Sequence, residues 1–474
     1  MTLFSLDEAT IIAAVRAISD PTAAPDADAR LPVGPVTEGP NAISSSANGP
    51  GAIGPGASGP DAIGPGTNSS GDDESLRAWA AERFARATWS GIAEPGDVAA
   101  GTLVRALGAA GALRALVERH SPERVRAEVI ATGTEFGSER EMALAIERWM
   151  PRLAANSALT SMRLAAQCGA RLLTPADDAW PAGLNDLDAH EPLALWVRGT
   201  PDSVAAVGHS LAIVGARAAT GYGEHVTMEL SAGLCDRGFG IVSGAAYGID
   251  GMAHRAALAS SGLTIAFLAG GVDRSYPSGH DSLLSRIASE GVIVSELPCG
   301  APPTKWRFLQ RNRLIAAVSK ATIVIEAGAR SGSLNTAAHA ASMGRPLGAV
   351  PGPVTSAASA GCHRLLREFD AVCVTSADEV AELIGCEPGG GEGSAGSEGR
   401  EGSAPSADRR HPQHLRVLDA LAVHTFRSVE DVASRTGMSI RDTQSVLGTL
   451  SLTREVVHED DGWKKAPASG RGRT

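Results

Sequence analysis

A short segment in the middle of the chain carries the residue types that hold a phosphate backbone. It spans residues 305–313 and has four cations, two aromatic residues and no acidic residue: Lys305, Trp306, Arg307, Phe308, Arg311 and Arg313. Cations beside a ring on which a base can stack are the chemistry that single-stranded nucleic acid requires. The alternative is that Trp306 and Phe308 are core residues and that the arginines cover acidic helix ends. Because the net charge of the chain is −11, any nucleic-acid contact must come from a local patch of this kind.

A second segment, residues 331–336, combines serine and glycine at a predicted strand-to-helix turn. It follows an apolar run that ends at Glu326 and it opens a helical stretch. Ser333 or its neighbours can cap that helix, and amides left free there can face a phosphate. Helix capping alone would also explain the serines.

The elements that must position these segments are short apolar runs that alternate with helical stretches. The runs are 211–214, 241–242, 264–268, 292–294, 321–325 and 347–350. Strands that are apolar along their whole length are buried on both faces, which requires a parallel sheet with helices on each side. The sequence therefore predicts an α/β fold with a Rossmann-like open parallel sheet.

A short segment that contains glycine or serine follows each apolar run. They are Gly215–Arg217, Ser243–Ala245, Gly270–Gly271, Ser295–Glu296, Glu326–Gly328 and Pro351–Gly352. In open parallel sheets the ligand lies beyond the carboxyl ends of the strands, and glycine or serine there lets the backbone approach it. The alternative is that these residues only make tight turns.

Several common sites are not expected. Gly221-x-Gly223 is not a dinucleotide fingerprint, because Val226 stands where the third glycine belongs, and no P-loop sequence occurs. We therefore expect no cofactor. Asp250 and His254 have the spacing of an acid/base or metal pair, but we favour a structural role for both. Six widely spaced cysteines form no C-x-x-C pair, so no metal site is expected and the thiols should be reduced, buried or inert.

With these residues in view, the core resembles the DNA processing protein A family, also called DprA or Smf. Matching motifs extend over about 180 residues, and residues 180–181 and 192–199 resemble the lead-in segment of the family. The motifs of the core are 213–217 with 220–223, 242–250 with 253–254, 276–277, 295–296, Phe308 with 311–316, Glu326, 331–333 with 336–337, and 350–352.

The resemblance implies a protein that binds single-stranded DNA without sequence preference, forms a homodimer through the Rossmann-like core, and helps load the RecA recombinase in DNA uptake and recombination. It further implies which residues touch the strand, with Phe308 as the candidate for base stacking. The strand contacts would be Arg217, Lys305, Phe308, Arg311 and Arg313, and the phosphate pocket would be lined by Ser243, Gly244, Ser331, Gly332 and Ser333. His280 and His363 stand where many members have Asn, which puts any polar contact of those amides in doubt.

Two other functions remain as alternatives. Phosphoribohydrolases with a related fold carry a P-G-G-x-G-T-x-x-E run, whereas residues 331–336 of this chain lack the glutamate that would act as acid/base. We therefore expect no enzymatic activity. The third possibility is a scaffold whose core only dimerises.

The domain organisation follows from composition and periodicity. A Gly/Pro/Ala-rich stretch with a ten-residue repeat predicts a disordered insertion, and a Gly/Ser/Glu-rich stretch predicts a linker. The predicted parts are an N-terminal helix (1–21), the insertion (22–72), a helical domain (73–160), the lead-in segment (161–204), the core (205–386), the linker (387–410), a winged-helix-like domain (411–466) and a disordered tail (467–474).

The winged-helix-like part has one more acidic residue than basic residues, which favours a protein contact over duplex binding. Asp7 and Glu8 stand where a basic leader would precede an apolar stretch, and no charge-free apolar run of membrane-spanning length occurs. We therefore expect no membrane segment and a cytoplasmic location.

Overall fold

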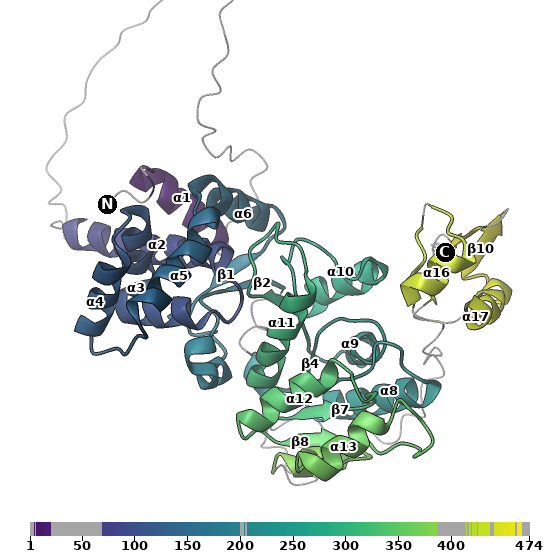
Figure 1. Cartoon of the computed structure of the whole chain (residues 1–474). Helices are drawn as coiled ribbons and strands as arrows, with labels where there is room; N and C mark the ends of the chain where they lie inside the picture. Colours follow the sequence, from purple (N-terminus) through teal and green to yellow (C-terminus); the bar gives the residue numbers. More distant parts are fainter. Residues whose placement is uncertain are drawn as a thin grey trace, which may run out of the picture.

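A nine-stranded sheet forms the centre of the computed structural model, which describes residues 4, 6–19, 69–199, 203, 206–385 and, with short gaps, 414–466 (Figure 1). The strand order is β1-β2-β6-β5-β4-β3-β7-β8-β9. All six predicted strands are confirmed, and neighbouring strands among them pair in parallel. They are β3 (Ser210–Val214), β4 (Gly240–Ser243), β5 (Thr264–Phe267), β6 (Val292–Ser295), β7 (Thr322–Val324) and β8 (Leu347–Ala349).

Three strands near the two ends of the sheet were not predicted, and two of them make the sheet mixed rather than wholly parallel. They are β1 (Arg171–Leu173), β2 (Leu195–Gly199) and β9 (Val372–Cys373). Strand β2 pairs antiparallel with β6, with Trp196 opposite Ser295, and β1 pairs antiparallel with β2. These strands are two to five residues long, so each gives only a weak pattern in sequence.

Helices cover both faces of the sheet, as the apolar strands require. In β3, Leu211 and Ile213 pack under α8 and α9, whereas Ala212 and Val214 share a core with α11, α12 and α13. This alternation is the two-residue period of a strand buried on both sides. The helices of the core are α8 (Gly221–Asp236), α9 (Ile249–Ala259), α10 (Asp281–Glu290), α11 (Lys305–Val318), α12 (Ser333–Ser342), α13 (Ala360–Glu368) and α14 (Ala377–Leu383).

In the described part of the chain, six α-helices precede the sheet, and their shared core packs against its β1–β2 edge (Figure 1). Trp196 of β2 lies in their core and donates its indole N–H to Ser90 Oγ at 3.1 Å. Trp89 and Trp149 meet edge-to-face within the same core, with ring centroids 5.1 Å apart. These N-terminal helices are α1 (Glu8–Ser19), α2 (Ser69–Ile92), α3 (Val98–Val117), α4 (Pro122–Ala131), α5 (Glu139–Trp149) and α6 (Ala155–Gln167).

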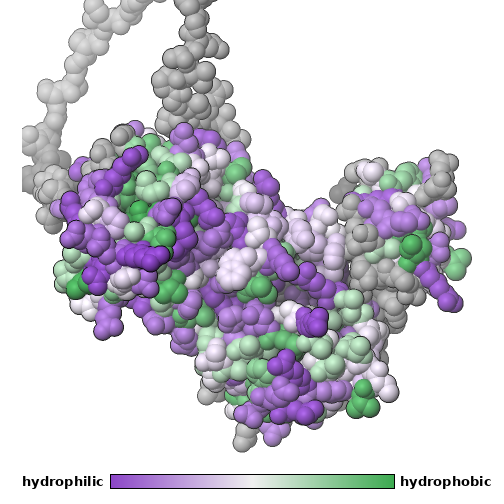
Figure 2. Space-filling model, viewed as in Figure 1, coloured by the Kyte–Doolittle hydropathy of each residue, from purple (hydrophilic) through white to green (hydrophobic). Residues whose placement is uncertain are grey.

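Helix α3 is, within the described ranges, the one helix long and apolar enough to cross a membrane by length and composition alone. Half of its most apolar stretch is buried among the N-terminal helices, and it contains Arg105 and Arg114 and a non-helical Gly108. Core helices of soluble proteins meet the same criterion. On the face drawn in Figure 2, the surface around these helices is mostly hydrophilic.

The described C-terminal part includes α16 (Val429–Thr436), α17 (Ile440–Leu452) and the antiparallel pair β10 (Val456–Glu459) and β11 (Gly462–Lys465). The predicted linker at 387–410 and the tail at 467–474 lie outside the described residues, as does the predicted insertion except for its last four residues. Those four residues, 69–72, belong to α2, so the first long helix begins earlier than the sequence predicted.

Two cysteines that are far apart in sequence meet where α6 ends and the core begins. The Cys299 thiol is buried and hydrogen-bonds to the sulfur of Cys168, which lowers the pKa of the Cys168 thiol to about 7. The same contact raises the pKa of Cys299. Cys168 and Cys235 are both partly buried, but Cys235 lacks the lowered pKa of Cys168, because burial raises the pKa of its thiol to about 12.

We expect alkylation of Cys168 by iodoacetamide to increase with pH through about 7, because the thiolate is the nucleophile. Cys235 and Cys362 should remain unlabelled in the folded protein over the same pH range, since burial keeps both thiols protonated. Cys299→Ala should shift the Cys168 curve to higher pH, because it removes the hydrogen bond that stabilises the thiolate. Peptide mass spectrometry across pH 6–9 measures the three curves, and an unchanged curve in Cys299→Ala would contradict this interpretation.

Candidate functional site

A groove of about 910 Å³ opens at the carboxyl ends of β3 and β7. These two strands are neighbours in the sheet although β4, β5 and β6 lie between them in sequence, so the strand order reverses here. Reversal points of open α/β sheets leave a crevice between the loops that follow the strands. The walls are the loop after β3 (214–218), the start of α11, and the loop after β7 that leads into α12.

Seven of the ten site residues predicted from sequence line this groove. They are Arg217, Lys305, Phe308, Arg311, Ser331, Gly332 and Ser333. They come from three segments spread over more than one hundred residues, and the parallel pairing of β3 with β7 brings two of those segments side by side. The other three, Ser243, Gly244 and Arg313, do not line it.

Phe308 is the aromatic centre of the groove. The guanidinium of Arg217 lies 5.1 Å from the centre of its ring and that of Arg311 lies 5.9 Å away, both within the range of cation–π attraction. The ring of Tyr276, from the loop after β5, lies 5.4 Å from the Phe308 ring at an angle of 50°. Tyr276 is 48% exposed and Phe308 is half-buried, so both rings are accessible from the groove.

Arg311 forms the floor of the groove and is only 7% exposed. Its Nη1 donates to the carbonyl oxygens of Gly244, at 2.7 Å, and Phe267. Burial lowers the pKa of Arg311 to about 10, while the charge of Asp250 opposes that shift, so the guanidinium stays charged at neutral pH. Arg311 therefore supplies a fixed positive charge whose Nη1 is already bonded within the protein.

Gly244 positions Arg311, and Ser243 bonds to the neighbouring strand β3, so neither residue lines the groove. Ser243 Oγ is fully buried and donates to the carbonyl of Ile213 at 2.7 Å. The Gly244 N–H donates to Asp250 at 3.2 Å, and a Cβ at Gly244 would lie 2.3 Å from the Arg311 guanidinium. Glycine is therefore required here because the arginine packs directly on the backbone.

Asp250 stands in the first turn of α9, where its carboxylate accepts the Gly244 N–H. Burial raises its pKa, and the charge of Arg311 opposes that shift. The neighbouring candidate His254 is fully buried, with Nδ1 2.7 Å from Thr264 Oγ1, and burial lowers its pKa to about 3. These contacts agree with the structural role expected for both residues.

Arg313 and Arg307 extend from the opposite side of α11. Arg313 is 2% exposed and forms two 2.7 Å hydrogen bonds with Glu296, and Arg307 pairs with Glu94. Residues 308, 311, 312 and 315 line the groove, whereas residues 307, 310 and 313 face away from it. The helical period of 3.6 residues places the two sets on different faces of α11. The residue types alone do not show which face each arginine occupies.

Ser331 and Ser333 lie at the groove wall that opens α12. Their hydroxyl oxygens are 2.7 Å apart, and the Ser333 N–H points to Ser331 Oγ at 3.4 Å. The N-cap residue of α12 is Gly332, which has no side chain to cap the helix. The serines therefore organise the turn at the positive end of the helix dipole, where an anion is favoured.

Among the lining residues that were not predicted as site residues, Arg330 and Tyr276 offer a cation and a ring to a ligand. Arg330 is exposed and adds a third exposed cation to the groove beside Arg217 and Lys305. Its position directly before the predicted serine segment was an available signal. Tyr276 was noted only as part of a motif, since nothing in sequence places the loop after β5 next to α11.

The two histidines that replace asparagine make polar contacts. His280 Nδ1 lies 3.0 Å from the carbonyl of Ala245, and His363 Nε2 lies 2.9 Å from that of Gly352. A carbonyl oxygen only accepts, so each imidazole donates, as an asparagine amide would.

Comparisons with known proteins agree on one family. Residues 171–385 match the family described as DNA recombination-mediator protein A. A putative DNA processing protein DprA of Mycobacterium tuberculosis is 45% identical over 323 residues, which cover 66% of this chain and 76% of that protein. DprA of Streptococcus pneumoniae is 37% identical over 208 residues, or 44% and 72% of the two chains. The X-ray structure of DprA from S. pneumoniae matches with a TM-score of 0.50 at 28% identity, covering 64% of this chain and 97% of that one.

Proposed function

This chain belongs to the DNA recombination-mediator protein A family, known as DprA or Smf, and we propose that its groove binds single-stranded DNA without reading the base sequence. The observation that carries the proposal is the ring of Phe308, which contacts the guanidinium groups of Arg217 and Arg311 in a groove with exposed cations. Any base can stack on a ring, and any phosphate can contact a cation, so such a site is indifferent to sequence.

Each part of the groove has a separate task. Phe308 and Tyr276 offer rings on which bases stack, and the exposed side chains of Lys305, Arg217 and Arg330 contact phosphates. Arg311 adds a positive charge. Its side chain does not have to be ordered when the strand binds, because it already donates hydrogen bonds to the carbonyls of Gly244 and Phe267.

The proposal is for binding without catalysis. Among the described residues that line the groove, Asp250 is the one carboxylate, and it already accepts the backbone N–H of Gly244 beside Arg311. The lining residues in the described part of the chain include no glutamate that could act as the acid/base of a phosphoribohydrolase. Release of a free base from a nucleoside monophosphate would instead favour the enzymatic alternative.

We further propose a cytoplasmic role in DNA uptake and recombination, in which the chain forms a homodimer through its Rossmann-like core and helps load the RecA recombinase. Membership of the family supports these proposals. Light scattering of the full chain tests the homodimer. Strand exchange by RecA, with and without the chain, tests RecA loading.

We also propose that α16, α17, β10 and β11 form a winged-helix domain with a protein-binding role, since two helices followed by a two-stranded ribbon fit that motif.

Mobility shift of oligonucleotides at several salt concentrations tests the DNA-binding proposal. The wild type should prefer a single strand over a duplex, and its affinity should fall as salt rises. Lys305→Ala should weaken binding and reduce the slope of log affinity against log salt by about 0.7, the value for one lost phosphate contact on a single strand.

Lys320→Ala is the matched control, because Lys320 is exposed at the opposite, amino end of β7. It should leave both affinity and slope unchanged. Equal slopes for wild type and Lys305→Ala would contradict the assignment of Lys305, and a wild type that binds neither strand would contradict the proposed function.

A further inference from the structure

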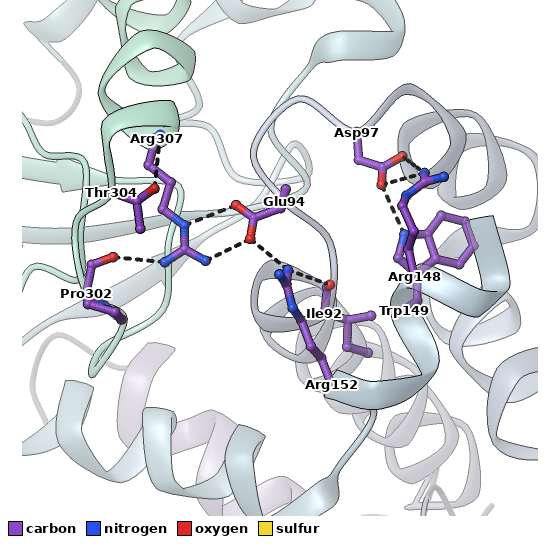
Figure 3. A network of polar contacts seen from close by, with 9 residues as sticks. All are labelled: Ile92, Glu94, Asp97, Arg148, Trp149, Arg152, Pro302, Thr304 and Arg307. Atoms are coloured by element: carbon purple, nitrogen blue, oxygen red, sulfur yellow. Dashed lines mark hydrogen bonds and ion pairs between the residues drawn. The ribbon is translucent and has the colours of Figure 1, made fainter. Parts of the chain in front are cut away.

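The turn between α2 and α3 holds α11 from the side opposite the groove (Figure 3). Glu94 in this turn receives two hydrogen bonds from Arg307 of α11, Nε to Oε2 and Nη2 to Oε1, each 3.0 Å long. The third nitrogen of the same guanidinium donates to the carbonyl of Pro302 at 2.9 Å. One side chain thus connects Glu94, the loop before α11 and the first turn of that helix.

A second contact from the same turn reaches α11 further along. The N–H of Gly96 donates to Glu296 Oε1 at 3.2 Å, and Glu296 is the partner of Arg313. Gly96 has φ +72°, and a Cβ there would lie 2.9 Å from the Gln310 side chain and 3.2 Å from Arg313 Nε. The helix is therefore held at two points six residues apart, which is about 9 Å along its axis.

The Glu94–Arg307 pair is intact at neutral pH. Burial raises the pKa of Glu94, but the hydrogen bonds and charge of Arg307, with the charge of Arg152, outweigh burial and lower it overall. The Arg307 side chain is 14% exposed, so solvent screens this bidentate pair less than a surface pair. Arg152 also contacts Glu94, at 2.8 Å, but it lies between α5 and α6, and its other described hydrogen bond is to the carbonyl of Ile92 and not to α11.

We propose that Glu94 is a positioning residue for DNA binding: by holding Arg307 it fixes the first turn of α11, which carries Lys305 and Phe308 into the groove. This inference rests on the proposed function. Thr304, Lys305, Phe308 and Leu309 line the groove on either side of Arg307 in sequence, so any displacement of Arg307 moves the groove wall. A wall already ordered before the strand arrives avoids the entropic cost of ordering it on binding.

Four forms of the full-length chain test the proposal by single-strand affinity: wild type, Glu94→Ala, Glu94→Gln and Arg152→Ala. We expect Glu94→Ala to weaken binding about three- to tenfold, the range for ordering one or two side chains. Glu94→Gln should lose less single-strand affinity than Glu94→Ala, because an amide oxygen still accepts one hydrogen bond from Arg307. Arg152→Ala, which removes an ion pair with Glu94 and leaves the contact with α11, should bind like the wild type.

The salt dependence separates positioning from a general loss of stability. Glu94→Ala should reduce the slope of log affinity against log salt as Lys305→Ala does, and adding it to Lys305→Ala should reduce the slope no further. If thermal unfolding shows that Glu94→Ala is poorly folded, the same measurements are made on Glu94→Gln and Arg307→Lys. Arg307→Lys loses the bidentate geometry, so it should also weaken single-strand binding and reduce the salt slope.

Three results would overturn the proposal: wild-type affinity and slope in the folded Glu94 variants, slope changes that add to that of Lys305→Ala, or an equal loss in Arg152→Ala. A wild type that does not bind single strands would instead overturn the proposed function, so the two failures are distinguishable.

Discussion

Arg313→Ala is expected to lower the free energy of unfolding of the core by about 3–5 kcal/mol, the range for breaking a buried ion pair from one side. The side chains of Arg313 and Glu296 are 3% and 11% exposed, and two 2.7 Å hydrogen bonds join them. Removing the guanidinium leaves the Glu296 carboxylate buried with only the Gly96 N–H as a partner among the contacts described. Denaturant titration followed by circular dichroism measures the change.

The matched control is Arg286→Ala, which removes an exposed i,i+4 pair with Glu290. Surface pairs of this type contribute about 0.3–0.5 kcal/mol, so the control should unfold almost like the wild type. Replacing both Arg313 and Glu296 by leucine should cost less than Arg313→Ala, because no charge is then left unpaired. If Arg313→Ala lost less than about 1 kcal/mol of stability but bound DNA much more weakly, Arg313 would instead be a residue that contacts the DNA strand.

Phe308→Ala is expected to weaken single-strand binding by roughly ten- to a hundredfold, since stacking on one aromatic side chain contributes about 1–3 kcal/mol. Two guanidinium groups and the Tyr276 ring lie around this ring, so its loss also removes the contact that orders Arg217. The salt slope should change little, because a ring carries no charge. Fluorescence anisotropy of a labelled oligonucleotide measures both quantities.

Trp306→Ala is the control for Phe308→Ala. Trp306 is two residues earlier on α11 and is more exposed, but it lies in the hollow beside the turn at 94–97 and not in the groove. Its removal should leave affinity unchanged, and Phe308→Trp should keep most of the binding. A greater loss in Trp306→Ala than in Phe308→Ala would move the stacking site to the other side of α11.

Much of the fold followed from the sequence. Each of the six apolar runs became a strand, because a strand buried on both faces must be apolar along its length. The short strands β1, β2 and β9 near the ends of the sheet were missed, since two to five residues carry little periodicity. Sequence patterns also did not predict long-range packing. Trp196 was assigned to a lead-in segment, yet it joins the core of the N-terminal helices to the sheet.

By itself, the sequence determined where the groove is and what kind of ligand suits it. The small residues after β3 and β7, the aromatic and basic segment at 305–313, and the missing dinucleotide and P-loop motifs are all local properties. Only the tertiary structure decided which cations serve the groove. Arg307 and Arg313 pair with Glu94 and Glu296, which lie 213 and 17 residues away in sequence, whereas Lys305 remains exposed and Arg311 is buried beneath the ring of Phe308. The physical reason is that a helix divides its residues between opposite faces, and the packing partners of each face come from distant parts of the chain.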